Sequence, residues 1–494
     1  MPHFAFLWAM GLGAVAGLGQ APVALPWLTL AAVAAVVWLH LMTDTVGRAA
    51  RLGWAFGFGY FALTLNWIVE PFLVDPVRHG WMAPFALGLL AAGLALFWGA
   101  AAGLARRFAD GQVQAALTWA IFIAIAELAR SYVLTGFPWA LVGHVWIGWA
   151  PAQWAAWIGA QGLTLVTLVL PALVAAVWPN RVAVGGIIAA GVAIYGIGVI
   201  QSGIAAFDPD TRPYVRLIQP NAPQHLKWHP DHVLGFFERQ VEQTAEPSTR
   251  PLDLIIWPET SVPIRLGQAE NALGHVQFAA NGVPVILGVQ RFVEGQAFNS
   301  LAVMNADGAI SDVYDKHHLV PFGEYIPGTA LFENLPIVGT FVQDHGFGYT
   351  PGPGARVLDL GSLGTALPLI CYEAIFAQDV NAANERPDWL MQITNDAWFG
   401  QWVGPYQHLA QARLRAIEQG LPMVRVANTG VSAVIDGKGH ILAQTKLNEI
   451  ATLDTALPPA LPKTLYARTG DWPATILFLI YTVGLTVARR RNRH

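Results

Sequence analysis

The sequence predicts a multi-pass α-helical membrane domain joined to an α/β extracytoplasmic domain. The first observation is composition: 54% of the 494 residues are hydrophobic and only 12% are charged, against about 25% charged in ordinary soluble proteins. The second is a series of long apolar segments before residue 202, with one more near the C-terminus. The third is the region 205–465, where charges return and short β-rich runs alternate with helical ones.

Eight segments approach the roughly 20 mostly apolar residues that a bilayer-spanning helix needs. We therefore expect a seven-helix transmembrane region in 1–204, followed by the α/β domain in 205–465. A C-terminal transmembrane helix and a basic cytoplasmic tail are expected in 466–494. The first segment is short and rich in glycine. The eight segments are 3–19, 22–42, 52–73, 81–104, 114–134, 154–178, 182–201 and 472–488.

Arginines in the short loops predict the orientation, because cytoplasmic loops carry an excess of Lys and Arg. If the N-terminus is cytoplasmic, only Arg78 and Arg130 fall in or near the outer loops. An odd number of spans then places 205–465 outside, and the last span returns the C-terminus to the cytoplasm. In a bacterium, this predicts an inner-membrane protein with a periplasmic α/β domain. The cytoplasmic arginines are Arg48, Arg51, Arg106, Arg107, Arg181, Arg489, Arg490, Arg491 and Arg493.

Glu127 and Arg130 are ionisable residues near the end of a predicted span. They are three residues apart, so they share one face of a helix. Ionisable residues at such positions are often functional. An ion pair that fixes helix packing explains them equally well, and the sequence leaves both interpretations open.

The region 205–465 is predicted to form strands and hairpins, with helices between them. Turn sequences NADG and DGKG separate β-rich runs. Two amphipathic helices are expected at HPDHVLGFFERQVEQTAE and GPYQHLAQARLRAIEQG. The expected strands or hairpins are PYVRLIQPN, LDLIIWPE, VPVILGVQRF, LAVMNADGAISDVY, TALPLICYE, WLMQITND and MVRVANTGVSAVID.

Cys371 is the only cysteine, so the chain can form neither an intrachain disulfide nor a Cys-based zinc site. The histidines form no HExxH pattern or other tight ligand cluster, and no metal is expected. The net charge of −4 gives no support to a nucleic-acid partner, which requires a concentrated basic face. By itself Cys371 is equally consistent with a buried apolar residue and a reactive thiol.

Three phrases around Cys371 favour the reactive interpretation. IIWPET contains Glu259, YDKHHLVPFGEY contains Lys316 and Glu324, and LICYE contains Cys371. Each of these side chains lies at or just past a predicted strand end, where α/β folds gather their sites. A cysteine nucleophile needs a base to take its proton, and a cation can stabilise the oxyanion. We therefore assign Cys371 as nucleophile, Glu259 as proton acceptor, Lys316 to oxyanion stabilisation and Glu324 as supporting carboxylate. A helix or turn cap for Glu259 and a surface charge for Lys316 remain the simpler explanations for each residue alone.

The three phrases resemble the carbon–nitrogen hydrolase (nitrilase) superfamily, whose Glu-Lys-Cys triad has the same order. The similarity covers about 213–455 and includes ITNDAWFG at 393–400. It implies an αββα sandwich. Seven spans before this domain and one after it resemble a narrower family, the apolipoprotein N-acyltransferases of bacterial inner membranes. VPFGEYIP, NDAWFG, and QPN with Trp228 are similar to that family.

This resemblance implies acyl transfer to the N-terminal diacylglyceryl-cysteine of an apolipoprotein, the last step of bacterial lipoprotein maturation. The donor would be a phospholipid such as phosphatidylethanolamine. The two-step ping-pong reaction would pass through a Cys371 thioester and need no cofactor or metal. Substrate contact is expected from five residues: Trp228, Tyr372, Glu373, Trp398 and Phe399. A loop at 328–352 is expected to meet the bilayer through Leu331, Phe332, Leu335, Ile337 and Phe341.

Two other functions use the same sequence features. A membrane-anchored nitrilase-type amidase would use the triad with water as acceptor, although a simple anchor would not require seven N-terminal spans. A transporter would use the outer domain only to bind its ligand. Transporters place polar or broken helices at the membrane midplane, where Asn66 and Gln161 are the main candidates here. A transporter should tolerate loss of Cys371, whereas an acyltransferase should not.

Overall fold

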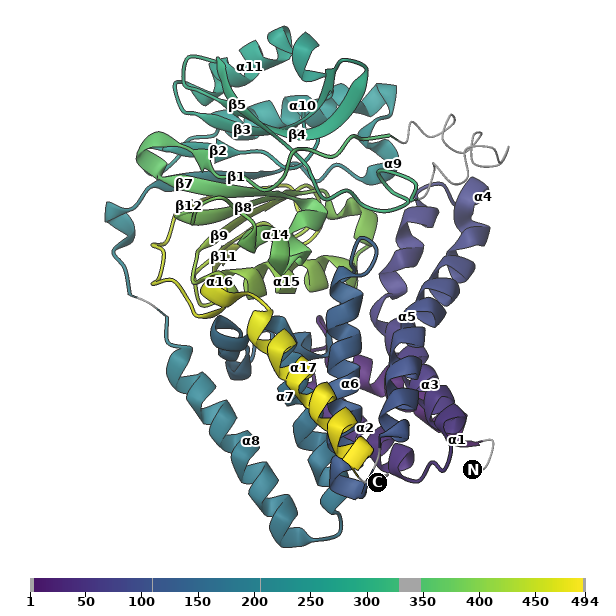
Figure 1. Cartoon of the computed structure of the whole chain (residues 1–494). Helices are drawn as coiled ribbons and strands as arrows, with labels where there is room; N and C mark the ends of the chain where they lie inside the picture. The colour runs from purple at the N-terminus through teal and green to yellow at the C-terminus, as the bar shows by residue number, and fades with distance from the viewer. Residues whose placement is uncertain (1–3, 109, 205, 328–347, 492–494) are drawn as a thin grey trace. The chain divides into compact units, whose positions relative to one another are not determined.

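The computed structural model describes residues 4–108, 110–204, 206–327 and 348–491. The chain forms two compact units. One contains Met1–Ile204, Phe399–Gly420 and Pro462–His494, and the other contains Ala205–Trp398 and Leu421–Leu461. The first unit is helical and the second is built on two β-sheets (Figure 1).

Each of the eight predicted apolar segments overlaps one apolar helix among the described residues. These helices are α1 (Phe4–Gly17), α2 (Pro26–Leu41), α3 (Val46–Thr64), α5 (Ala83–Arg107), α6 (Gln112–Tyr132), α7 (Ala155–Val177), α8 (Arg181–Gln201) and α17 (Trp472–Arg491). Short pieces extend or connect them. They are η1 (Asn66–Leu73), α4 (Pro76–His79), η2 (Gly80–Met82), η3 (Val142–Trp146), η4 (Ala150–Trp154) and α16 (Tyr466–Thr469).

Five helical stretches among the described residues are long and apolar enough to cross a membrane. They are Pro76–Arg107, Gln112–Tyr132, Ala150–Val177, Arg181–Gln201 and Trp472–Arg491. The pair α3 and η1, bent by 46°, makes a sixth if it counts as one span. Helices α1 and α2 are shorter, with 14 and 16 residues. Many large apolar side chains on α8 and α17 are exposed, as expected for helices that face lipid.

Small residues bring α3 and α5 into close contact. A Cβ atom at Gly53 would lie 2.7 Å from the carbonyl oxygen of Trp98, and one at Gly99 would lie 3.2 Å from that of Ala50. Without side chains at these positions, the two backbones approach closely. Such small-residue contacts are a common way to pack helices within a bilayer.

Glu127 and Arg130 form a fully buried ion pair on α6. Nη2 of Arg130 lies 2.8 Å from Oε2 of Glu127, and Nε1 of Trp98 donates to Oε1 of Glu127 at 2.9 Å. Arg130 also donates to the carbonyl oxygens of Phe137 and Trp139. The pair thereby joins α5, α6 and the segment after α6. These contacts favour the helix-packing interpretation.

The α/β unit contains two six-stranded mixed sheets. The first has the order β12-β1-β2-β3-β4-β5, and its members are β1 (Tyr214–Gln219), β2 (Leu254–Ile256), β3 (Val285–Val293), β4 (Gln296–Met304), β5 (Ile310–Asp315) and β12 (Ala451–Ala456). The second has the order β11-β10-β9-β8-β7-β6, and its members are β6 (Leu358–Asp359), β7 (Thr365–Ile370), β8 (Trp389–Thr394), β9 (Met423–Ala427), β10 (Ala433–Ile435) and β11 (Ile441–Gln444). In each sheet the three central strands that lead to the site run parallel: β1-β2-β3 and β7-β8-β9.

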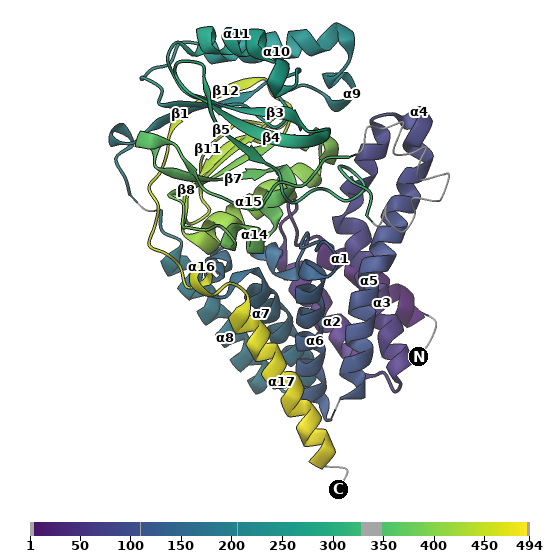
Figure 2. The ribbon, with the colours of Figure 1, turned by 45° about the horizontal axis from the view of Figure 1, so that its top comes forward.

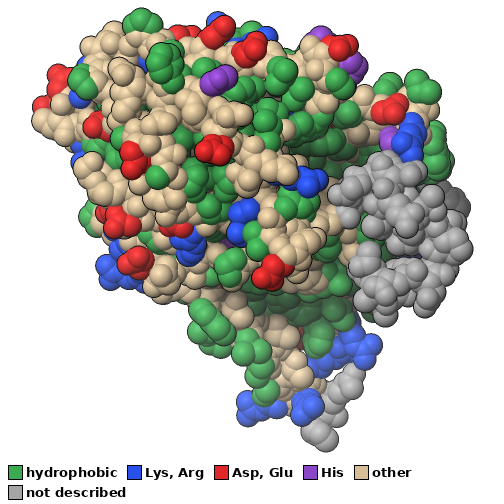
Figure 3. Space-filling view, turned by 90° about the horizontal axis from the view of Figure 1, so that it is seen from above, with side chains coloured by type: hydrophobic (Ala, Val, Ile, Leu, Met, Phe, Trp, Pro, Cys, Tyr) green, Lys and Arg blue, Asp and Glu red, His purple; other side chains and the backbone are tan. Residues whose placement is uncertain are grey.

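Helices α10 (Pro230–Ala245) and α11 (Glu270–Ala280) cover the outer face of the first sheet, while the second sheet lies on its other side (Figures 1 and 2). Phe237 of α10 and Val276 of α11 pack with Trp257, Val285 and Leu287 in one buried core. Short helices α9 (Gln224–Lys227) and α14 (Ala377–Asn381) follow strands β1 and β7. On the face shown in Figure 3, acidic, basic and apolar side chains are interspersed.

The second predicted amphipathic helix is α15 (Gly404–Gln419), whose segment groups with the helical unit. The combination of many apolar helices with a two-sheet α/β domain confirms the predicted fold class.

Candidate active site

Four strands of the α/β unit end beside the polar side chains of the site. Glu259 follows β2, Lys316 follows β5, Cys371 follows β7 and Asn395 follows β8. Strands that run in the same direction present their carboxyl ends at one edge of a sheet, which is where α/β folds place reactive groups. Segments that are far apart in the sequence thereby meet in one cluster.

The carboxylate of Glu259 is buried and held from two directions. Nδ2 of Asn299 donates to Oε1 at 2.7 Å, and the backbone N–H of Asn395 donates to Oε2 at 2.8 Å. Nζ of Lys316 lies 3.7 Å from Oε1. The glutamate is only 6% exposed, so these bonds fix its orientation while keeping it available as a proton acceptor.

Lys316 lies between two carboxylates. Its ammonium donates to Glu324 at 2.9 Å and faces Glu259. Burial alone would lower the pKa of Lys316, but Glu324 and Glu259 outweigh burial and hold the pKa above its usual value. Glu324 is itself held by the backbone N–H of Val320 at 2.8 Å. Lys316 is therefore a fixed positive charge at neutral pH.

Cys371 is 5% exposed and has a positive φ of 51°, a conformation that costs free energy in a non-glycine residue. Burial and the neighbouring Glu259 raise the pKa of the thiol, while Lys316 and a hydrogen bond with Thr394 act in the opposite direction. The net shift is upward. The resting thiol is therefore protonated, and it needs a base at the moment of attack.

A buried network supports the Cys371 backbone. Nε2 of Gln392 donates to the carbonyl oxygen of Cys371 at 3.1 Å, and Nη1 of Arg425 donates to Gln392 at 2.6 Å. Arg425 also forms a fully buried ion pair with Asp396, which accepts a bond from Thr394 at 2.9 Å. Residues of the second sheet thus support the backbone of Cys371, whose φ is positive.

Gly288 on β3 makes room for the turn that carries Glu259. A Cβ atom at Gly288 would lie 2.3 Å from the carbonyl oxygen of Pro258 and 2.7 Å from Cα of Glu259. Such distances are too short for any side chain. This close approach is a requirement of the site that was not recognised from the sequence.

Two of the predicted substrate-contact residues differ in exposure. Trp228 is 44% exposed, and the Lys227 ammonium lies 5.6 Å from its ring centroid. Tyr372 is buried and packs edge-on against Phe376, with ring centroids 4.9 Å apart. Trp228 is therefore accessible to a ligand without rearrangement of the α/β unit.

Glu373 is completely buried and accepts hydrogen bonds from its own domain. Its Oε1 accepts from the Tyr314 hydroxyl at 3.0 Å and from the backbone N–H of His317 at 2.7 Å. Its Oε2 accepts from the backbone N–H of Ile370 at 2.7 Å. These bonds connect the segments before Cys371 and after Lys316, and they favour a positioning role for Glu373 over direct substrate contact.

Trp398 and Phe399 fall at the boundary between the two units. Trp398 belongs to the α/β unit and is 39% exposed. Phe399 belongs to the helical unit, where its ring packs 4.9 Å from Trp67 and 5.6 Å from Trp139. The apolar residues predicted to meet the bilayer, Leu331, Phe332, Leu335, Ile337 and Phe341, lie outside the described residues.

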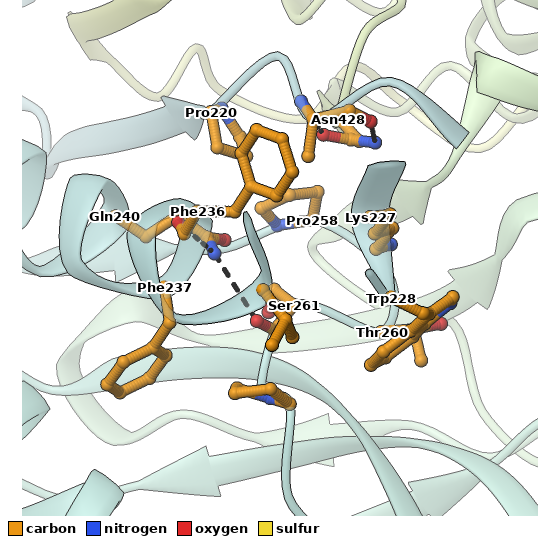
Figure 4. Close-up of a pocket in the computed structure, with 13 residues that line it drawn as sticks. Pro220, Lys227, Trp228, Phe236, Phe237, Gln240, Pro258, Thr260, Ser261 and Asn428 are labelled. Atoms are coloured by element: carbon orange, nitrogen blue, oxygen red, sulfur yellow. Dashed lines mark hydrogen bonds between the residues drawn. The ribbon is translucent and has the colours of Figure 1, made fainter. Parts of the chain in front are cut away.

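A small pocket opens beside the Glu259 turn (Figure 4). Pro258 and Thr260, which flank Glu259, line it together with Lys227 and Trp228. Phe236 and other side chains of α10 form its apolar wall. The pocket joins an aromatic, partly exposed entrance to the backbone that carries the proposed base.

Asn299, Asn395 and Lys227 contact Glu259 but were not identified as site residues from the sequence. Asn395 belongs to the phrase ITNDAWFG, and Lys227 directly precedes Trp228, so both lay beside recognised signals. Asn299 lies inside a β-strand in no motif. Among the described residues, no group of three or more His, Cys, Asp or Glu side chains is arranged to hold a metal ion.

Two family models match the chain. The carbon-nitrogen hydrolase model matches residues 215–463, and the model of the apolipoprotein N-acyltransferase N-terminal domain matches residues 12–173. The fold and the site therefore define a carbon-nitrogen hydrolase domain attached to a multi-helix membrane region. The XC1258 structure from Xanthomonas campestris, a CN-hydrolase superfamily protein, is 22% identical and covers 54% of this chain and 96% of its own, with a TM-score of 0.36.

Curated relatives identify the narrower family. The apolipoprotein N-acyltransferase of Rhodopseudomonas palustris is 38% identical over 90% of this chain and 87% of its own. That of Bradyrhizobium diazoefficiens is 37% identical over 98% of this chain and 95% of its own. The chain belongs to the apolipoprotein N-acyltransferase family. It is an acyltransferase and a membrane protein, as predicted.

Proposed function

We propose that this enzyme moves an acyl chain from a phospholipid to the N-terminal amine of a diacylglyceryl apolipoprotein, through a thioester on Cys371. The observation that carries the proposal is the convergence of a buried thiol, a carboxylate and an ammonium at neighbouring strand ends. Each has the chemical property that its role needs: an attackable sulfur, an oriented base and a permanent cation.

In the first half-reaction, Glu259 takes the Cys371 proton and the sulfur attacks the sn-1 ester carbonyl of the phospholipid. The carbonyl oxygen becomes an oxyanion, which Lys316 stabilises. Collapse of this intermediate breaks the ester C–O bond. Glu259 returns the proton to the leaving oxygen, so lysophospholipid departs and the acyl group remains on sulfur.

In the second half-reaction, the apolipoprotein amine attacks the thioester carbonyl. Glu259 accepts a proton from the amine, the C–S bond breaks, and the sulfur regains the proton. The product is an amide and the free thiol is restored. No cofactor enters either step. Glu324 keeps Lys316 in place throughout, supported by their 2.9 Å contact.

The arginine distribution supports an orientation in which both termini are cytoplasmic and the α/β unit faces the periplasm across a bacterial inner membrane. Both reactants would then reach the thiol from the outer leaflet. Trp228, Tyr372, Trp398 and Phe399 are proposed to contact the lipid substrates. The exposed ring of Trp228 at the mouth of the pocket supports this assignment most directly.

Incubation of the purified full-length protein with phospholipid labelled in its sn-1 chain tests the proposal. A labelled, hydroxylamine-sensitive protein band is expected for the wild type, because thioesters react readily with hydroxylamine. Cys371→Ala removes the sulfur and should abolish the band. Label retained by this variant at the wild-type level would assign the nucleophile to another residue.

An amidase that uses water as acceptor remains the second candidate, because it uses the same three residues. The two functions differ in their products. Transfer yields an N-acylated peptide when a diacylglyceryl peptide is supplied, whereas hydrolysis releases free fatty acid or ammonia whether or not the peptide is present. Release of free fatty acid or ammonia without any N-acylated peptide would overturn the transferase proposal.

A further inference from the structure

Lys227 places a second buried ammonium at the site. It is the last residue of α9, is 7% exposed, and its Nζ donates to the backbone carbonyl oxygen of Glu259 at 3.2 Å. In Figure 4, Lys227 lies beside Trp228 and the turn that contains Pro258 and Thr260. Burying an ammonium is costly unless it is compensated, so the position of this charge requires an explanation.

The charges around the site supply that explanation. Two carboxylates, those of Glu259 and Glu324, flank the single ammonium of Lys316. Lys227 interacts electrostatically with both Glu259 and Cys371. With Lys227 charged, two ammonium groups balance two carboxylates. Without it, the site carries an uncompensated negative charge before the sulfur loses its proton.

We propose that Lys227 is a positioning residue that holds the Glu259 turn through its carbonyl group and favours negative charge on the Cys371 sulfur. This inference rests on the proposed roles of Glu259 and Cys371. Lys227 adds the cation that makes proton transfer between those two groups less costly. It acts through Glu259 and through its charge, and it does not itself exchange a proton with substrate.

The titration of the neighbouring groups fits this role. Burial lowers the pKa of Lys227 to about 8, while Glu259 and Cys371 oppose the shift. The ammonium is therefore present at neutral pH and is lost as the pH rises above about 8. The other charged groups that face Cys371 are Lys316 and Asp396, and Asp396 is neutralised by its ion pair with Arg425.

The test measures how fast iodoacetamide alkylates the full-length protein in detergent as a function of pH. Because Cys371 is the only cysteine, the rate reports this thiol alone. Three variants separate charge from hydrogen bonding. Lys227→Arg keeps both, Lys227→Gln keeps a donor without charge, and Lys227→Met removes both. Lys446→Met, at an exposed turn of the same unit, is the matched control.

At pH 7, where Lys227 is charged, Lys227→Gln and Lys227→Met are expected to be alkylated about tenfold more slowly than the wild type, because a nearby cation favours the thiolate. The difference should shrink above pH 8, where Lys227 loses its proton. Lys227→Arg should restore most of the wild-type profile, and Lys446→Met should leave it unchanged. If Lys227→Met fails to fold, the comparison of Lys227→Gln with the wild type is the test of the inference. Profiles of Lys227→Gln that superimpose on the wild type would overturn the inference.

This measurement needs no phospholipid, so it can be separated from the test of acyl transfer. Retained acyl label in Cys371→Ala, combined with a shifted alkylation profile in Lys227→Gln, would reject the transferase mechanism and leave the Lys227 inference standing. Loss of the label in Cys371→Ala, combined with an unchanged alkylation profile in Lys227→Gln, would support the transferase mechanism and reject the Lys227 inference.

Discussion

At the scale of single residues, the candidate site combines a thiol that is protonated at rest with a carboxylate that is fixed in place. Burial keeps the Cys371 thiol protonated by raising its pKa, and hydrogen bonds from Asn299 and Asn395 orient Glu259. A thiol that is kept buried and protonated in this way is protected from oxidation, because oxidation follows thiolate character and exposure. In the proposed mechanism, the sulfur becomes nucleophilic only when Glu259 takes its proton.

Glu259→Gln keeps the size of the side chain but removes the base. We expect the rate of acyl-enzyme formation to fall by about 10²- to 10⁴-fold, the usual contribution of a general base. Rapid-quench measurement of labelled protein gives this rate. Glu242→Gln, at an exposed position of α10, is the control and should behave like the wild type. A change of less than tenfold in Glu259→Gln would require a different proton acceptor.

His317 links the site to pH-dependent stability. Burial lowers its pKa, but hydrogen bonds with Asp379 and Glu373 outweigh burial and raise the pKa to about 10 from 6.5. The pKa of His317 is higher in the folded state than in the unfolded state, so protonation of His317 stabilises the fold. This stabilisation is complete below pH 6.5 and is lost as the pH rises toward about 10. Thermal unfolding in detergent at several pH values measures the effect.

His317→Gln removes the titrating group, so the difference in Tm from the wild type should be largest near pH 6 and should shrink toward pH 10. Comparing the two proteins at each pH cancels the contributions of other groups, including Lys227. A constant difference across this range would show that the charge of His317 does not stabilise the folded state.

From the sequence we predicted three reactive residues, which stay a prediction, but not the groups that the structure places around Glu259. Glu259, Lys316 and Cys371 each lie in a short phrase with a recognisable order. Asn299 is an amide within an ordinary β-strand, and only the pairing of β4 with its neighbours brings it to both Glu259 and Glu324. Long-range pairing of this kind leaves no local pattern in the sequence.

At the scale of elements, the site depends on turns that begin where strands end. The Glu259 turn packs directly on the backbone of β3, and glycine at position 288 is what permits the contact. The positive φ values of Thr260 and Cys371 occur in two such turns. Strand pairing supplies the constraint that holds these less favourable conformations.

Gly288→Ala places a methyl group where the Glu259 turn lies. We expect a loss of about 1–3 kcal/mol in the free energy of unfolding, the usual cost of overpacking, and a larger fractional loss of acyl transfer because Glu259 is displaced. Gly274→Ala in α11 is the control, since a Cβ atom there meets nothing within 4 Å. Equal activity in the two variants would contradict this account of the turn.

Hydropathy indicated where the apolar helices of the described residues lie, but not how long each one is. Helices α1 and α2 end after 14 and 16 residues, although the predicted segments were longer. Composition does not reveal where a helix stops, because turn residues between apolar helices are themselves largely apolar here. The break between α3 and η1 was missed for the same reason, since both halves are apolar.

At the scale of the whole molecule, the chain combines a two-sheet α/β unit with a set of long apolar helices. The α/β unit supplies the strand ends that gather the reactive groups, and the apolar helices supply the membrane tether. Both parts of this architecture were predicted from the sequence. The orientation across the bilayer is a proposal based on the arginine distribution, and it calls for a direct test.

Single cysteines introduced into a Cys371→Ser background test that orientation. In intact spheroplasts, a membrane-impermeant maleimide should label Lys446→Cys in the α/β unit but not Arg491→Cys at the end of α17. Both positions are exposed in the structure, so a difference in labelling would report which side of the membrane each position faces. Labelling of Arg491→Cys alone would place the α/β unit in the cytoplasm and contradict the proposed orientation.

The covalent intermediate is the central claim, and intact-protein mass spectrometry tests it most directly. After incubation with a phospholipid of defined sn-1 chain, the protein should gain the mass of one acyl group, located on the peptide that contains Cys371. Addition of a diacylglyceryl peptide should remove that mass and yield an acylated peptide. An unmodified protein after incubation with the phospholipid alone, or an acyl group on any other residue, would contradict the account.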